Sequence, residues 1–265
     1  MKKIYLVIVD PQNDFCDPKG ALYIPNAEKD IQRLADMICK HKKDIHHIQV
    51  TMDSHYWVHI AHPVFWEGKD GKSPQPLTLI KSEDVIGDKP LWRARHAAYR
   101  ERAKHYVKQL EANGRYTLCI WPPHCIFGTW GHNVHSDLNG ALKEYQEVFG
   151  SVKFSFKGSN LFTEHYSAVK ADVVDPADPS TNIDLNLIDM LAQADEVLFA
   201  GEALSHCVAN TMHDVLKHLG HENAEKFVIL KDASSNIPGF EAYGNTFLKE
   251  MDKLGLKTTT TEDYF

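Results

Sequence analysis

The stretch Ile4-Tyr-Leu-Val-Ile-Val-Asp10 decides the fold class, because an apolar run rich in β-branched residues ends abruptly in a carboxylate. Such a run predicts a strand that is buried on both faces of a sheet. Similar runs predict further strands at 44–52, 146–156, 196–200, 226–230 and 256–260. Apolar residues at helical spacing predict helices at 27–42, 183–194, 207–219 and 240–253.

Strands that alternate with helices indicate an α/β fold. We therefore expect a single doubly wound, Rossmann-like domain over 1–265, with a mostly parallel six-stranded sheet and helices on both faces. The alternation of strands and helices is interrupted at about 56–116. This segment is rich first in Gly, Pro, Lys and Asp and then in charged residues. We expect this segment to be an insertion after the second strand, acting as a lid or an oligomer contact.

Composition argues against several classes of protein. The chain carries a net charge of -7 and no long Lys/Arg block, which argues against nucleic acid and anionic membranes as partners. No run approaches the roughly 20 apolar residues that a membrane-spanning helix needs. Five widely spaced cysteines suggest no disulfide framework, so we expect a cytoplasmic protein.

Polar residues follow the ends of four predicted strands. They are Asp10, Asp53, Lys157 and Gly201, and the last leads on to Cys207. Strand ends often carry polar residues simply because loops begin there. In a parallel sheet, however, ligands bind beyond the carboxyl ends of the strands, and three charged residues at that edge favour a site.

The segment Gly201-Glu-Ala-Leu-Ser-His-Cys207 joins a predicted strand to a predicted helix. A helix N-terminus there would favour a thiolate and could stabilise an oxyanion. Asp10 could then serve as general base, and Lys157 would favour ionised carboxylate and thiolate. The alternatives are a small buried cysteine at a helix start and a structural Asp–Lys ion pair.

Several histidines have the spacing of metal ligands. Asp53 and His55 are two residues apart after a strand, and His124 lies in Trp121-Pro-Pro-His124. Mixed oxygen and nitrogen donors suit Zn, Fe or Mn rather than a closed thiolate zinc site. His59 and His62 follow closely; they are either surface residues of a His-rich loop or further ligands, and the sequence leaves both alternatives open.

Five motifs occur in a fixed order and together resemble the isochorismatase-like cysteine hydrolases, with nicotinamidases as the closest group. The motifs are Val7-Ile-Val-Asp10-Pro-Gln-Asn-Asp-Phe15, Asp53-Ser-His55, Trp121-Pro-Pro-His124-Cys-Ile-Phe-Gly-Thr-Trp-Gly131, Phe156-Lys157-Gly158 with Tyr166-Ser-Ala168, and Gly201-Glu-Ala-Leu-Ser-His-Cys207-Val. The resemblance covers nearly the whole chain outside about 56–116.

The resemblance implies a role for each matching residue. It implies a catalytic triad, two backbone N–H groups that hold the oxyanion, a cis peptide before Ala203, three side chains that contact substrate, and three ligands for one divalent metal ion. Zinc is the expected ion, with iron and manganese as alternatives. The triad would be Asp10, Lys157 and Cys207; the N–H groups those of Ala203 and Cys207; the substrate contacts Phe15, Trp121 and Tyr166; and the metal ligands Asp53, His55 and His124.

The implied activity is hydrolysis of nicotinamide, or a related aromatic carboxamide, to the acid and ammonia through a thioester. The resemblance further implies a place in pyridine nucleotide salvage and a homo-oligomer that acts on a small amide. The chain departs from the family where Glu202 replaces an apolar residue, where Leu204 and Ser205 precede the nucleophile, and in the long insertion.

Those departures keep other functions open. A second hypothesis retains the triad but takes another small amide, ureido or N-carbamoyl substrate. A third is a non-catalytic ligand- or metal-binding protein on the same scaffold. A nucleotide-binding oxidoreductase is disfavoured, because no Gly-x-Gly-x-x-Gly motif follows the first strand.

Overall fold

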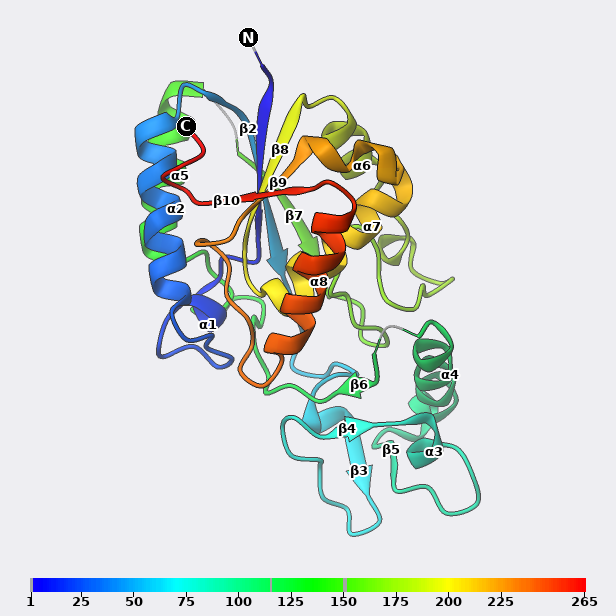
Figure 1. The fold of residues 1–265 in the computed structure, drawn as a ribbon. Coiled ribbons are helices and arrows are strands. Elements are labelled where there is room, and N and C mark those ends of the chain that lie inside the picture. The colour runs from blue at the N-terminus through cyan, green and yellow to red at the C-terminus, as the bar shows by residue number, and fades with distance from the viewer. Residues whose placement is uncertain (1, 115, 150–151) are drawn as a thin grey trace.

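A six-stranded parallel sheet forms the centre of the molecule in the computed structural model, which describes residues 2–114, 116–149 and 152–265 (Figure 1). Its strand order is β10-β9-β8-β1-β2-β7, and every neighbouring pair is parallel. The predicted fold class is therefore confirmed. The strands are β1 (Ile4–Val9), β2 (Ile45–Asp53), β7 (Lys153–Lys157), β8 (Glu196–Gly201), β9 (Phe227–Leu230) and β10 (Lys257–Thr259).

Helices cover both faces of this sheet. Figure 1 shows α2 and α5 on one side and α6, α7 and α8 on the other. The apolar stripe of α2 is buried, as its spacing predicts, with Ile31, Leu34 and Ile38 almost fully enclosed. The helices on the two faces and the short elements near them are α1 (Asn13–Cys16), α2 (Ala27–His41), α5 (Ser136–Phe149), η3 (Pro179–Thr181), α6 (Leu185–Ala192), η4 (Leu204–Val208), α7 (Ala209–Leu219), η5 (His221–Lys226) and α8 (Glu241–Lys253).

Two predicted elements need correction. The strand expected at 146–156 is wrong in its first part, because residues 146–149 end α5 and β7 begins only at Lys153. Leu138, Leu142 and Tyr145 are buried at helical spacing, a pattern that extends the helix into the predicted strand. The helix expected from Cys207 also starts differently, since Cys207 lies in the π-helical turn η4 that precedes α7.

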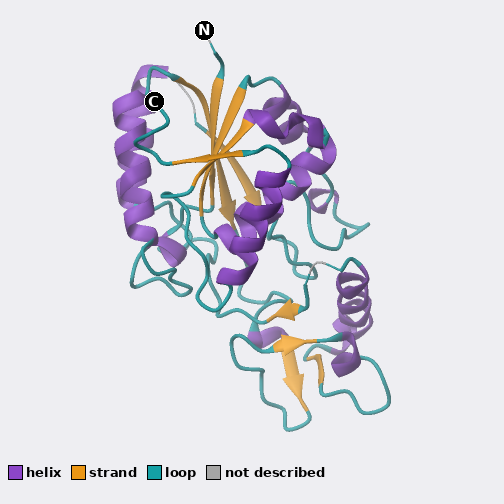
Figure 2. Cartoon of the chain, viewed as in Figure 1, coloured by secondary structure: helices purple, strands orange, loops and turns teal. Residues whose placement is uncertain are grey.

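The segment after β2 forms a separate lobe below the carboxyl end of the sheet, largely of loops (Figures 1 and 2). It holds two antiparallel pairs, β3 with β5 and β4 with β6. Trp66 is fully buried there, and its indole N–H donates to the Ile60 carbonyl at 2.6 Å. The elements are η1 (Pro63–Phe65), β3 (Trp66–Gly68), β4 (Leu79–Ile80), α3 (Ser82–Val85), β5 (Trp92–Ala94), η2 (Ala97–Tyr99), α4 (Arg100–Ala112) and β6 (Leu118–Cys119).

Two global features agree with the sequence. Within the described ranges, no helix combines the length and apolar character that crossing a membrane requires. All five cysteines are free, and four of them are buried.

Candidate active site

The candidate site lies where β8, β1, β2 and β7 end side by side. Val9 is in register with Gly201, and Asp53 with Lys157, so the loops that follow these strands start at one edge of the sheet. Gly201 has a φ of 108°, and a Cβ there would lie 2.1 Å from the Val9 carbonyl oxygen. Glycine is therefore required where the chain leaves β8 for the cysteine turn.

Lys157 is the centre of the charged groups. Its Nζ lies 2.8 Å from Asp10 Oδ2, 3.1 Å from Asp53 Oδ1 and 3.5 Å from Cys207 Sγ. All four residues are buried. Burial alone would lower the pKa of Lys157, but the carboxylates of Asp10 and Asp53 outweigh it and hold that pKa well above its usual range. The lysine is consequently a buried cation that faces both the carboxylate and the thiol.

Asp10 is held in an unusual backbone conformation. Its φ is 45°, in the left-handed region that non-glycine residues seldom adopt. Such strain concentrates at functional sites, where the surrounding structure enforces it. Thr51 Oγ1 donates to Asp10 Oδ1 at 2.6 Å and fixes the carboxylate. Burial raises the pKa of Asp10, and Lys157 only partly offsets this, so the carboxyl can take up a proton more readily than an exposed aspartate.

The Cys207 thiol differs from the sequence-based expectation of a stabilised thiolate. Burial raises its pKa well above the usual range, although the Lys157 ammonium acts in the opposite direction. The negative charges of Asp10 and Asp53 raise the thiol pKa further. Desolvation therefore outweighs the favourable charge, and the resting group is a thiol with a carboxylate base beside it.

The peptide between Glu202 and Ala203 is cis, as the resemblance implies. Among the described residues, the Ala203 N–H donates to no protein acceptor. A backbone donor that is free at the edge of the Cys207 pocket is available to a ligand oxygen.

Asp53, His55 and His124 form a compact group of possible metal ligands. Asp53 Oδ2 lies 2.9 Å from His55 Nε2 and 3.2 Å from His124 Nε2. The other ring nitrogens face carbonyl oxygens, His55 Nδ1 that of Gly158 at 2.9 Å and His124 Nδ1 that of Pro122 at 2.8 Å. Imidazoles oriented in this way by a second partner are typical of metal sites. The donor set suits a divalent transition ion.

Close packing leaves Asp53 and His55 little freedom. Gly158 has a φ of 84°, and a Cβ there would lie 2.8 Å from both Asp53 Oδ1 and His55 Cε1. The Gly158 carbonyl can orient His55 only because this residue lacks a side chain.

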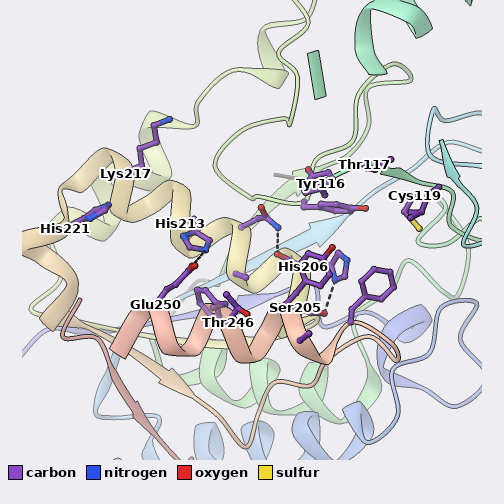
Figure 3. A pocket seen from close by; sticks show the side chains of 18 residues that line it. Tyr116, Thr117, Cys119, Ser205, His206, His213, Lys217, His221, Thr246 and Glu250 are labelled. Carbon is purple, nitrogen blue, oxygen red and sulfur yellow. Dashed lines mark hydrogen bonds and ion pairs between the residues drawn. The ribbon is translucent and has the colours of Figure 1, made fainter. Parts of the chain in front are cut away.

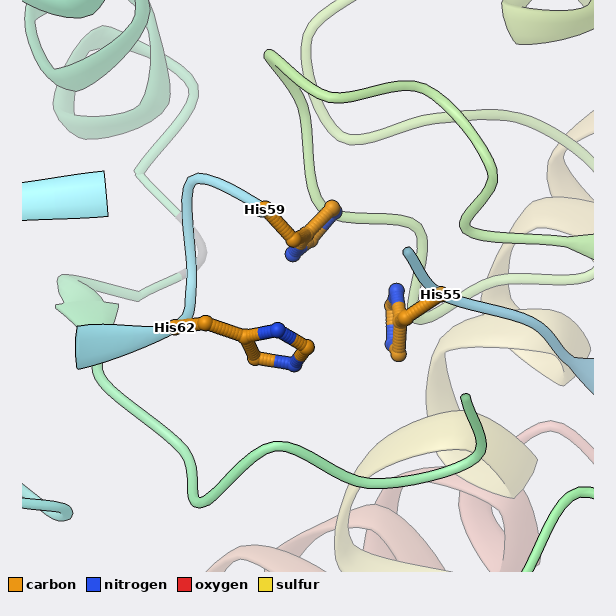
Figure 4. A group of neighbouring side chains, drawn as sticks. All are labelled: His55, His59 and His62. Carbon is orange, nitrogen blue, oxygen red and sulfur yellow. The ribbon is translucent and has the colours of Figure 1, made fainter. Parts of the chain in front are cut away.

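His59 and His62 are buried, which excludes the alternative that they are surface residues. Their rings lie 4.3 Å and 5.2 Å from that of His55, centroid to centroid (Figure 4). Both nitrogens of His59 are engaged, Nδ1 by the Ala61 N–H and Nε2 by the Thr163 carbonyl. No lone pair of His59 is left for a metal, whereas His62 Nε2 has no hydrogen-bond partner among the described residues.

A small cavity of about 20 Å³ adjoins the thiol. All three predicted substrate contacts line it, and Trp121 Nε1 donates to the Tyr166 hydroxyl at 2.7 Å. That volume admits a water molecule but no aromatic ring. Side chains must therefore move before an aromatic substrate can enter. The lining residues are Phe15, Leu22, Asp53, Trp121, His124, Glu164, Tyr166, Ala203, His206, Cys207 and Ile237.

A larger cavity of about 780 Å³ opens next to it, between α7, α8 and the lobe after β2 (Figure 3). Its volume lies within the range of small-molecule pockets. Tyr166 and His206 line both cavities and form part of the wall between them.

Three residues at the site were not predicted from the sequence. The Gln12 side chain exchanges two hydrogen bonds of 2.7 Å with the backbone of Asp53, and Thr51 holds Asp10. Gln12 and Thr51 lie two residues from Asp10 and Asp53 in the sequence, and this proximity could have indicated them. Glu164 is buried in the small cavity, and its Oε2 has no hydrogen-bond partner among the described residues. Only its place two residues before Tyr166 could have indicated it.

Known proteins resemble this chain in sequence and in structure. No family model matches the sequence. The chain is 28% identical over 206 residues to a nicotinamidase of Saccharomyces cerevisiae, covering 78% of each protein. The structure resembles that of an Acinetobacter baumannii nicotinamidase/pyrazinamidase, with a TM-score of 0.66, 22% identity and coverage of 100% and 99%.

It also resembles the pyrazinamidase of Pyrococcus horikoshii in complex with zinc, with a TM-score of 0.56 and 22% identity, over 97% of this chain and 99% of that one. At such identities the structural likeness shows the fold. The zinc-bearing neighbour and the Asp53, His55 and His124 group both suggest a divalent metal.

Proposed function

We propose that this chain, an amide-hydrolysing enzyme of the isochorismatase-like family and its nicotinamidase group, is a metal-assisted cysteine amidohydrolase that converts nicotinamide or a closely related aromatic carboxamide to the acid and ammonia. One observation carries the proposal. A single buried ammonium, that of Lys157, lies 2.8 Å from the Asp10 carboxylate and 3.5 Å from the Cys207 sulfur, beside a cluster of metal-type donors.

The arrangement supports acylation of the thiol. Asp10, which contacts the same Lys157 ammonium as Cys207, takes the thiol proton, and the thiolate adds to the amide carbonyl. The Lys157 ammonium stabilises the negative charge as it moves from carboxylate to sulfur. Backbone N–H groups of Ala203 and Cys207 receive the oxyanion, and each such donor contributes about 3 kcal/mol to the barrier reduction.

The raised pKa of Asp10 suits the second half of the reaction. A carboxyl group that readily carries a proton can return it to the departing ammonia and leave a thioester on Cys207. The same carboxylate then activates water, which releases the acid. Phe15, Trp121 and Tyr166 would contact the ring.

Asp53, His55 and His124 would hold one divalent ion, with zinc expected first and iron or manganese as alternatives. A bound ion would supply a Lewis-acidic anchor for a heteroaromatic nitrogen or for a water, and so would orient the ring. We also propose that residues 1–265 form one hydrolase domain with the 56–116 lobe as an insertion, and that the reaction serves pyridine nucleotide salvage.

Ammonia release from nicotinamide tests the proposal. The wild-type protein, loaded with metal, should release ammonia and nicotinate in equal amounts, and Cys207→Ser should reduce the rate by several orders of magnitude. Cys119→Ser, a change at another buried cysteine, is the matched control and should keep most of the activity. Ammonia release that persists in Cys207→Ser would contradict the proposal.

A panel of amide, ureido and N-carbamoyl compounds separates the substrate from the chemistry. The cavity of about 780 Å³ beside the small pocket makes a larger substrate worth testing. If nicotinamide is inert and another compound is hydrolysed by wild type but not by Cys207→Ser, the reaction class stands and the substrate assignment is wrong.

A further inference from the structure

Glu202, one of the residues at which the sequence departs from the family, meets a second acid in the interior. It follows β8 directly and is fully buried. The Ser235 N–H donates to Glu202 Oε2 at 3.1 Å, and the Ser235 hydroxyl donates to Oδ2 of Asp30 in the first turn of α2. Two carboxyl groups from distant segments therefore converge on one serine.

Because both accept a hydrogen bond from Ser235, the two carboxyl groups lie close together, and the Asp30 charge acts on Glu202. Two buried carboxylates held close together repel each other, and this repulsion is removed when one of them carries a proton. Glu202 Oε1 has no hydrogen-bond partner among the described residues. Burial and the Asp30 charge raise the pKa of Glu202 well above its usual range. Burial also raises the pKa of Asp30, but Ser235 and Arg33 partly offset this, so Asp30 ionises more readily than Glu202. These contacts place the proton on Glu202.

The charged and titratable groups around the pair do not reverse this assignment. Glu28 of α2 and the Cys16 thiol of α1 face it, and Glu28 raises the pKa of Glu202 further. Arg33 pairs with Asp30 Oδ1 and is partly exposed. The nearby cation thus lies on the Asp30 side.

The pair is fastened to the loop that carries the predicted oxyanion donor. The Leu204 N–H donates to the Ser235 carbonyl at 2.8 Å, and the Ser234 hydroxyl donates to the Gly201 carbonyl at 2.6 Å. These two bonds flank Ala203 on either side. A displacement of residues 234–235 would therefore also displace the Ala203 N–H.

We propose that Glu202 is a positioning residue that shares one proton with Asp30, and that this singly charged pair holds the Ala203 N–H where the oxyanion forms. Loss of the proton would bring two negative charges into contact at Ser235 and loosen the loop. Turnover should therefore fall on the alkaline side as the pair ionises. The kinetic part of this inference rests on the proposed function, whereas the shared proton does not.

Kinetics of ammonia release across about pH 5–9 test the positioning role. Glu202→Ala should lower kcat roughly 10- to 100-fold with little change in KM, because the contact matters mainly in the transition state. Glu202→Gln, which keeps a donor toward Asp30 and an acceptor for Ser235, should restore most of kcat and extend the alkaline limb to higher pH. Glu196→Gln, at the other end of β8, is the matched control and should leave the limb in place.

Melting temperatures over the same pH range test the proton without any substrate. An acid with a raised folded-state pKa contributes its full stability below its ordinary pKa of about 4.3, and this contribution is lost as pH rises toward the folded value. Glutamine has no such loss, so the melting temperature of Glu202→Gln minus that of wild type should increase with pH.

The two readouts separate the possible failures. A melting difference that is flat with pH overturns the shared proton, even if the enzyme is active. An unchanged kcat in Glu202→Ala, or an alkaline limb that Glu202→Gln does not move, overturns the positioning role. If no amide is hydrolysed, the proposed function and the positioning role fail together, while the melting difference still decides the proton.

Discussion

The Lys157 ammonium lies 3.1 Å from Oδ1 of Asp53, whose other oxygen faces the two histidines. One carboxylate therefore borders both the thiol centre and the candidate metal centre. Because the two groups of residues are adjacent, a substrate held at one of them is presented to the other.

Replacing the buried cation should damage both stability and activity. Lys157→Met keeps the length of the side chain but leaves the Asp10 and Asp53 carboxylates buried without their partner. We expect a loss of about 3–5 kcal/mol in the free energy of unfolding. Urea denaturation measures it, and kcat should fall together with it.

Lys153→Met is the matched control, because Lys153 is exposed at the start of the same strand. It should change the stability by no more than about 0.5 kcal/mol. Equal effects of the two substitutions would show that the buried ion pairs contribute nothing special.

Metal content distinguishes His124 from His59. His124→Ala should lower the affinity for a divalent ion at least 10- to 100-fold, as expected for loss of a ligand or its support. His59→Gln should keep one ion per chain, because both nitrogens of His59 are already hydrogen-bonded. Metal analysis after dialysis against a graded chelator gives both values, and loss of the ion in His59→Gln alone would reverse the assignment.

Access to the thiol should depend on His206, which lines both cavities. His206→Ala removes part of the wall, so bulky maleimides should alkylate Cys207 several-fold faster, with a smaller effect on iodoacetamide. His213→Ala, which changes only the larger cavity, should not alter the ratio of the two rates. Peptide mapping identifies Cys207 among the five cysteines, and an unchanged ratio in His206→Ala would place the entrance elsewhere.

The alkylation rate of Cys207 should also report its pKa. Because burial raises that pKa, the thiol predominates at neutral pH, and the rate should keep rising with pH beyond about 8.5, the ordinary thiol value. A thiolate stabilised by the helix N-terminus would instead give a plateau near neutral pH. Such a plateau in wild-type protein, absent from Cys207→Ser, would show that charge outweighs desolvation.

Much of the architecture could be predicted from hydrophobic patterning. The central strands β1 and β8 are buried on both faces, so their apolar runs were unambiguous. The convergence of Asp10, Asp53 and Lys157 followed from parallel pairing, because strand ends that are neighbours in a parallel sheet lie together.

Edge positions and local burial could not be predicted in the same way. β7 is an edge strand with Phe154 and Phe156 exposed, so its pattern could not be separated from the preceding helix. The thiol pKa depends on desolvation, which no sequence motif states. Ser235 links Glu202 to Asp30, two residues far apart in the chain, and in the sequence Asp30 is only one of several polar residues in the first turn of a helix.

The most direct test is to trap the acyl intermediate. Wild-type protein turning over nicotinamide should be quenched in acid within milliseconds, digested and examined by mass spectrometry. The Cys207 peptide should carry one nicotinoyl group, which hydroxylamine removes as expected for a thioester, and Cys207→Ser should carry none. Steady hydrolysis with an unmodified Cys207 peptide, or a nicotinoyl group on another residue, would contradict the assignment of the nucleophile.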